Sequence, residues 1–117
     1  MKIKKLDIHS RDFENSTPLH WACIQKLPQD ARLSIMYLLA MGANPNLQDH
    51  EGNTALHLAV KAAQKNDSTL AIRQLLLNRA DRSLTNHTGK TAFEYATLID
   101  ELDWREVIER TLIEGEI

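Results

Sequence analysis

The stretch that decides the fold is Thr-Pro-Leu-His-Trp-Ala at residues 17–22. It returns as Thr-Ala-Leu-His-Leu-Ala at residues 54–59 and, altered, as Thr-Ala-Phe-Glu-Tyr-Ala at residues 91–96. The step is 37 residues both times. Self-similarity at one fixed period is typical of a stack of repeated units, each of which buries its apolar face against its neighbours. The chain is therefore predicted to form a linear array rather than one closed core, and an active site is not expected.

The position two residues before each motif threonine carries a residue that tolerates a positive φ. Gly52 and Gly89 occupy it before the second and third copies, and Asn15 occupies it before the first. Glycine and asparagine adopt the left-handed conformation most readily. This position is therefore predicted to lie in a tight left-handed turn.

Each motif opens a short helical pattern. The three predicted helices run over Pro18 to Gln25, Ala55 to Ala63 and Ala92 to Ile99. The hydroxyl of the threonine directly before each helix can cap its first turn. A second helical pattern follows in each copy, and an aspartate is its predicted N-cap. These aspartates are Asp30, Asp67 and Asp103.

These residues resemble the ankyrin repeat. Its units start a first helix with Thr-Pro-Leu-His, carry a Leu-Leu pair in a second helix, and continue through Gly-Ala into the next hairpin turn. Here a Leu-Leu pair at 38–39 precedes Gly-Ala at 42–43, and another at 75–76 precedes Arg79 and Ala80, with the arginine where glycine is usual. The resemblance covers essentially Asp7 to Ile113.

The resemblance implies an all-α fold, an ankyrin-repeat solenoid of helix–loop–helix pairs joined by β-hairpin-like turns. We expect one domain over residues 1–117, with repeats at about 12–48, 49–85 and 86–117 and an N-terminal half-turn or cap at 1–11. The family repeat has about 33 residues. The surplus here lies between the two helices, before Asp30 and Asp67, and predicts either an extended helix or a longer loop.

The resemblance also implies a structural role for the motif histidine, which in this family hydrogen-bonds the backbone of the adjacent hairpin. The histidines of the first two copies are therefore not expected to be ligands or general bases. Glu94 replaces the histidine in the third copy and predicts a looser last turn. The residues expected to be structural are His20, His57, Thr17, Thr54, Thr91, Gly52 and Gly89.

Composition and motifs exclude several functions. The net charge of -2 offers no general attraction to nucleic acid, and no apolar stretch reaches the roughly 18 residues that a membrane span needs. The single cysteine, Cys23, favours a reduced, cytoplasmic chain in which it packs as a small hydrophobic residue. No phosphate-binding glycine loop, Cys/His metal spacing or nucleophile-elbow motif is present. We therefore expect no catalytic residues, cofactor or metal.

Any function is expected at the positions that differ between copies. In ankyrin arrays these are the hairpin tips and the inner face of the first helices, which together form a concave surface. Carried onto this chain, the expected partner-binding residues are Arg11, Phe13, Glu14, Ser16, Ile24, Gln25, Gln48, His50, Glu51, Asn53, Lys61, Thr85, His87, Thr88 and Lys90.

Two aromatic residues leave alternatives open. Phe13, at a hairpin tip, is either a binding residue or a lid over the uncovered side of the first repeat. Trp21 aligns with Leu58 in the next copy, and we expect it to pack in the core rather than bind a partner.

The sequence favours a non-catalytic protein–protein interaction module, an adaptor or inhibitor that is monomeric and binds another protein rather than nucleic acid or membrane. The alternative is a regulatory or targeting fragment of an enzyme, or a secreted effector that acts inside a host cell. Neither reading identifies the partner, because a repeat scaffold of this kind does not define its own ligand.

Overall fold

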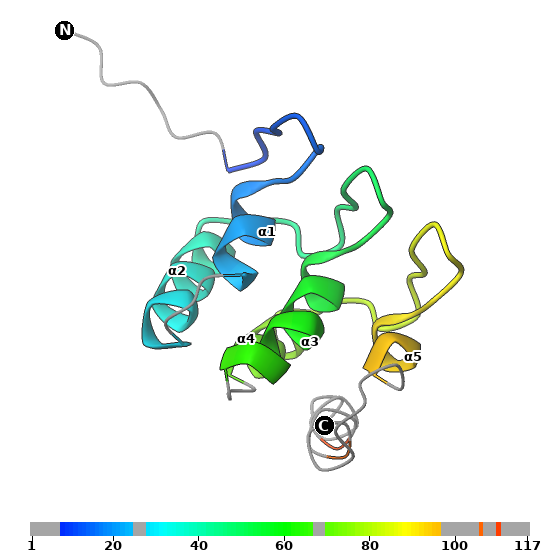
Figure 1. Ribbon diagram of the computed structural model, residues 1–117. Coiled ribbons are helices and arrows are strands. Elements are labelled where there is room, and N and C mark those ends of the chain that lie inside the picture. Colours follow the sequence, from blue (N-terminus) through cyan, green and yellow to red (C-terminus); the bar gives the residue numbers. More distant parts are fainter. Residues whose placement is uncertain (1–7, 25–27, 67–69, 97–105, 107–109, 111–117) are drawn as a thin grey trace, which may run out of the picture.

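A computed structural model describes residues 8–24, 28–66, 70–96, 106 and 110 of the chain (Figure 1). Its described part contains five helices and no strand: α1 (Pro18–Cys23), α2 (Pro28–Ala40), α3 (Ala55–Asn66), α4 (Leu70–Leu77) and α5 (Ala92–Ala96). Three turns of similar shape precede α1, α3 and α5 and project to the same side.

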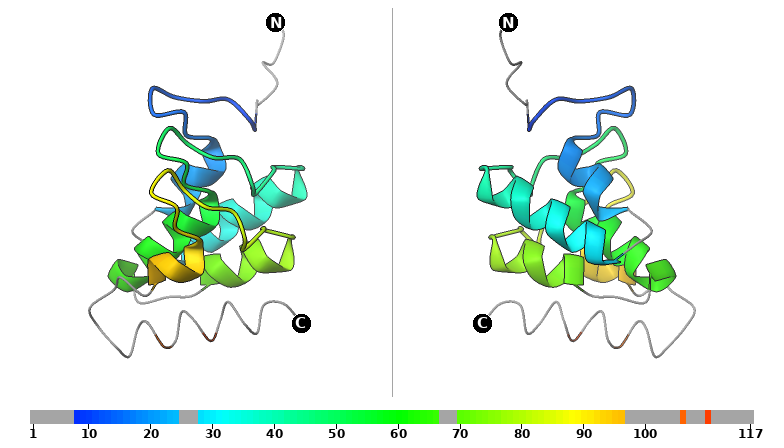
Figure 2. Two further views of the ribbon diagram at one scale, coloured as in Figure 1. Left: turned by 90° about the vertical axis from the view of Figure 1, so that its right-hand side faces the viewer. Right: turned by 90° about the vertical axis from the view of Figure 1, so that its left-hand side faces the viewer.

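The helices form two layers. α3 packs between α1 and α5, and α2 packs against α4, while α1 contacts α2 and α3 contacts α4 within their own repeats. Figure 2 shows the first helices in one row and the second helices in another, with the turns beyond the first row. The predicted all-α solenoid is confirmed.

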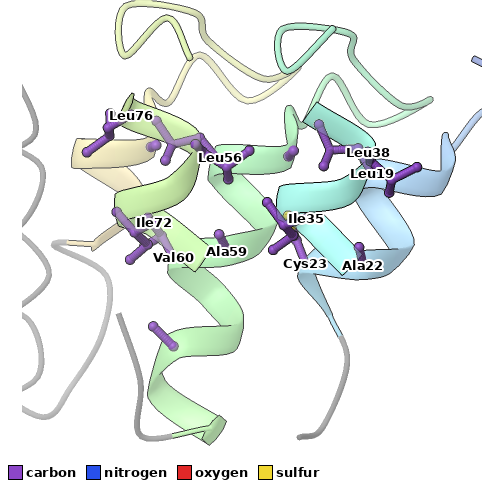
Figure 3. Close-up of a cluster of buried hydrophobic side chains, with 14 of the residues drawn as sticks. Leu19, Ala22, Cys23, Ile35, Leu38, Leu56, Ala59, Val60, Ile72 and Leu76 are labelled. Carbon is purple, nitrogen blue, oxygen red and sulfur yellow. The ribbon is translucent and has the colours of Figure 1, made fainter. Parts of the chain in front are cut away.

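The core follows the 37-residue period. Leu19 and Ile35 are buried in the first copy, and their counterparts Leu56 and Ile72 are buried in the second. Figure 3 shows these side chains meeting between the two layers. Each helix pair thus buries one apolar side within its repeat and another against the next repeat, as a solenoid requires.

The surplus residues extend helices, and in different places in the two copies. α2 begins at Pro28, so Asp30 lies inside its first turn and the prediction that Asp30 caps the helix is wrong. Proline is favoured at the first helical position because its fixed φ is already helical and its missing N–H would have no partner there. In the second copy α3 instead continues to Asn66, beyond its predicted end.

Other predicted boundaries are corrected or lie outside the described residues. α1 ends at Cys23, with Ile24 as its C-cap, and is therefore two residues shorter than the helix predicted to end at Gln25. Gln25 itself, Asp67, Asp103 and the part of the third helix pair from residue 97 to 105 are not among the described residues.

Candidate binding surface at the hairpin tips and groove

One side chain shapes each of the three turns in the same way. The backbone N–H groups of Glu14 and Ser16 donate to Asp12 Oδ1 at 3.0 and 2.9 Å. Asp49 Oδ1 accepts the corresponding pair at 2.9 Å each, and Asn86 Oδ1 accepts it at 3.1 and 3.0 Å. This role was not among the predictions, although the sequence carries a signal for it: the three residues recur at the repeat spacing of 37.

The turns are joined to one another by backbone hydrogen bonds. His50 N–H donates to the carbonyl of Glu14 and His87 N–H to that of Glu51, both at 2.9 Å. These hydrogen bonds between successive turns hold the three tips at fixed spacing along one edge of the molecule.

The residue predicted to be left-handed has φ 63° at Asn15, 80° at Gly52 and 77° at Gly89, which confirms that prediction.

His20 caps α1 and reaches the next repeat. Thr17 N–H donates to His20 Nδ1 at 3.1 Å, while His20 N–H donates to Thr17 Oγ1 at 3.4 Å. Because Nδ1 accepts, the ring proton is on Nε2, which donates to the Asn53 carbonyl at 2.9 Å. The pair is a capping box in which histidine takes the place of the usual glutamate or glutamine.

His57 repeats this arrangement one copy later. Its Nδ1 accepts from Thr54 N–H at 3.3 Å, and its Nε2 donates to the Lys90 carbonyl at 2.8 Å. Burial lowers the pKa of His57, although the Lys90 carbonyl and the nearby Asp49 oppose that effect. The geometry is that of a neutral structural histidine rather than of a metal ligand.

Glu94 keeps half of this function. It accepts from Thr91 N–H at 3.0 Å, and its own N–H donates to Thr91 Oγ1 at 3.1 Å. The first turn of α5 is therefore capped by the same pair of hydrogen bonds as α1 and α3, and the looser turn expected for this copy stays a prediction. A carboxylate has no counterpart of the Nε2 donor with which His20 and His57 bond the following turn.

A groove lies between the turns and the first helices and encloses about 680 Å³. Its charged residues are Glu14, Asp49, Glu51 and Lys61, and its apolar residues are Trp21, Ile24, Leu58 and Ala62. Among the residues that the structure describes, three carboxylates and one ammonium line it, which gives this part of the lining a negative charge. It runs across the first two repeats.

Trp21 lies in this groove, and the prediction that it packs in the core is wrong. Its side chain is 51% exposed, and its indole N–H donates to Asp12 Oδ2 at 2.8 Å. This bond, after the stronger one from Ser16 N–H, helps to lower the pKa of Asp12. The polar end of the indole thus anchors the ring beside the first turn while much of its face stays open to solvent.

Phe13 is fully exposed at the tip of the first turn, so it does not cover the first repeat as a lid. The exposed residues among those expected to bind a partner include Arg11, Glu14, Ile24, Gln48, His50, Glu51, Lys61, Thr85, His87 and Thr88. Ser16 and Lys90 are half-buried. Of this set, Glu14, Ser16, Ile24, Glu51 and Lys61 line the groove, whereas Arg11 lines a separate hollow with His9, Asn44 and Leu47.

Asn53, which also belongs to that set, lines the groove. It is only 6% exposed, and its side-chain oxygen accepts from Asn86 Nδ2 at 3.0 Å. Its backbone carbonyl accepts a hydrogen bond from His20 Nε2. Asn53 therefore joins consecutive repeats.

The described part of the chain holds no group of three or more His, Cys, Asp or Glu side chains that would coordinate a metal ion. No helix there combines the length and apolar character needed to cross a bilayer. Cys23 is buried, and burial raises the pKa of its thiol, so it is not a reactive thiolate.

The two-layered helix pairs, the linked turns and the bridging histidines define a helical repeat protein. The family model for ankyrin repeats in three copies matches residues 2–67 and 29–114, and the chain belongs to the ankyrin repeat family. No curated protein matches the chain. Ankyrin repeats are generally protein–protein interaction modules and are typically non-catalytic.

Proposed function

We propose that this protein is an adaptor or inhibitor that binds a partner protein along the turn tips and in the groove beneath them. The observation that carries the proposal is the exposure of apolar side chains where the scaffold does not need them. Phe13 is fully exposed and Trp21 and Ile24 are about half exposed, all on the side of the turns. Aromatic side chains held in exposed, partly enclosed positions are the commonest anchors of protein interfaces.

The rigidity of this surface supports the same conclusion. The tips are tied together by the hydrogen bonds from His50 and His87 N–H to the preceding turns. Gln48 Nε2 also donates to the Thr85 carbonyl at 2.8 Å. A surface that is already ordered loses less conformational entropy when it binds.

The test is affinity capture of partners with the full chain as bait, followed by mass spectrometry. The matched bait carries Phe13→Ala, Trp21→Ala and His50→Ala, and a control bait carries Leu77→Ala on α4, whose side chain is 70% exposed away from the groove. We expect proteins that are retained by the wild type and by the control but lost from the triple variant. Equal retention by all three folded baits would refute the proposed surface.

The expected monomeric state and cytoplasmic location belong to this proposal. Light scattering of the purified chain would test the first, and localisation of a tagged chain would test the second. The alternative, a fragment of an enzyme or a secreted effector, stays a hypothesis that rests on the family alone.

A further inference from the structure

The groove combines apolar and acidic side chains, which one segment of a partner protein can contact together. Its floor is apolar, with Trp21 and Ile24 exposed, and its rim carries Glu14, Glu51 and Asp49. Lys61 is the one cation among the described residues of the lining. A partner of opposite charge is favoured at such a rim, while apolar contacts below supply affinity.

The first and third turns each have a side-chain hydrogen bond that the second turn lacks. In the first turn both oxygens of Asp12 are used, because Oδ2 accepts from the indole N–H of Trp21. In the third turn Asn86 uses its second side-chain atom to donate to Asn53.

Asp49 differs from both. Its Oδ1 binds the turn, but the residue at the position of Trp21 is Leu58, which has no donor. Within the described residues, Oδ2 of Asp49 receives no hydrogen bond, and this carboxylate lines the groove. The second turn therefore offers an acceptor at the place where the first turn is satisfied internally.

We propose that the groove binds a protein segment that carries an arginine next to an apolar side chain, with the guanidinium donating to Asp49 and the neighbouring glutamates. This inference rests on the proposed function and specifies the partner's chemistry. Arginine fits better than lysine because its planar fork donates to carboxylates in pairs and stacks on an indole face such as that of Trp21. The apolar neighbour would lie against Ile24 and Leu58.

The first experiment is selection of random twelve-residue peptides displayed on phage against the full chain. We expect arginine next to an apolar residue to be enriched among the binders. Affinity of the selected peptides would then be measured by titration calorimetry. Replacing their arginine by alanine should weaken binding about tenfold, the loss expected for one charge-assisted contact, and replacing it by lysine should recover only part of that loss.

Variants of the chain test the same contact from the other side. Asp49→Asn keeps the turn, because Asn86 serves the third turn in the same way. It should weaken the selected peptides about tenfold. Lys61→Gln should strengthen them, because it removes the competing cation. Glu106→Gln, an exposed carboxylate outside the groove that pairs with Arg110, should leave the affinity within about twofold.

Three outcomes would overturn the inference. Enrichment of acidic or purely uncharged peptides that still require Trp21 would refute the arginine and leave the proposed surface standing. Peptides that bind Trp21→Ala as well as the wild type would refute both. Arginine peptides that are insensitive to Asp49→Asn while the variant stays folded, as checked by circular dichroism, would refute the assigned contact.

Discussion

At the scale of single residues, the motif histidines illustrate how one side chain stabilises two repeats. His57 is 1% exposed and joins the start of α3 to the turn of the following repeat. His57→Ala leaves the Lys90 carbonyl and the Thr54 N–H without these partners. We expect the free energy of unfolding to fall by about 1–3 kcal/mol, the cost of leaving buried groups unsatisfied.

Urea denaturation of the variant measures this effect. His87→Ala is the matched control, because His87 is exposed and its contribution to the hydrogen bonds between the turns comes from its backbone N–H. It should change stability by no more than about 0.5 kcal/mol. Equal losses in the two variants would contradict the structural role of His57.

The same histidine makes stability depend on pH. Burial lowers the pKa of His57 in the folded state, so the unfolded chain, with its ordinary value near 6.5, takes up the proton first. Stability is therefore complete above about pH 6.5 and falls as the pH drops from there toward the folded-state pKa. The melting temperature should decrease across this range, and His57→Gln, which does not titrate, should show a smaller decrease.

Gly52 meets two requirements where Gly89 meets one. Both have positive φ, but a Cβ on Gly52 would lie 2.6 Å from His87 Cδ2 and 2.7 Å from His87 N, whereas a Cβ on Gly89 would meet nothing within 4 Å. Gly89→Ala should cost about 1–2 kcal/mol from the left-handed backbone alone. Gly52→Ala should cost about 1–3 kcal/mol more, because the next turn must move. Equal costs in denaturation experiments would show that the contact with His87 is unimportant.

At the scale of elements, α2 and α4 end in the same motif with different residues. After α2, Gly42 N–H donates to Leu39 and Ala43 N–H to Leu38, which is the Schellman pattern. Arg79 and Ala80 make the corresponding bonds to Leu76 and Leu75 after α4. Arg79 therefore has φ 69° where Gly42 has 95°, and the arginine carries a steric cost that glycine avoids.

Arg79→Gly should consequently stabilise the protein. Relief of the left-handed strain outweighs the added freedom of glycine in the unfolded chain, and a net gain of about 0.5–1 kcal/mol is expected. The reciprocal change, Gly42→Arg, should lose a similar amount, because nothing but the backbone conformation restricts that position. Thermal unfolding of the two variants gives the comparison, and a stability loss in Arg79→Gly would contradict it.

At the scale of the whole molecule, α3 is the element through which the described repeats are coupled. It contacts α1, α4 and α5, and its Leu56 is 1% exposed. Leu56→Ala should lower stability by about 2–5 kcal/mol. Because repeats are stabilised by their neighbours, hydrogen exchange should accelerate in the first and third copies as well as in the second.

Leu77→Ala is the control for this effect, because Leu77 is 70% exposed at the end of α4. It should leave exchange in all three copies nearly unchanged. Acceleration confined to the second copy of Leu56→Ala would mean that the repeats fold independently of one another.

The repeat period by itself determined the family, the two layers of helices, the left-handed turns and the buried pairs such as Leu19 with Leu56. These features follow from the local conformational preferences of the residues and from the periodic apolar pattern, and both can be read directly from the sequence. The period also aligned the residues of the turns, whereas the structural role of His20 and His57 followed from the resemblance to the ankyrin repeat.

Only the tertiary structure decided which residues at equivalent positions of the repeats face the solvent. Trp21 was expected in the core because Leu58 shares its position, but an indole that bonds to Asp12 is held at the groove. Asn53 was expected at a tip, but a bond from the next repeat draws it inward. Likewise, the same surplus of residues extends α2 in one copy and α3 in the other. The exposure of these side chains and the lengths of these helices depend on contacts between repeats. The sequence period indicates that such contacts exist, but it does not show which side chains make them.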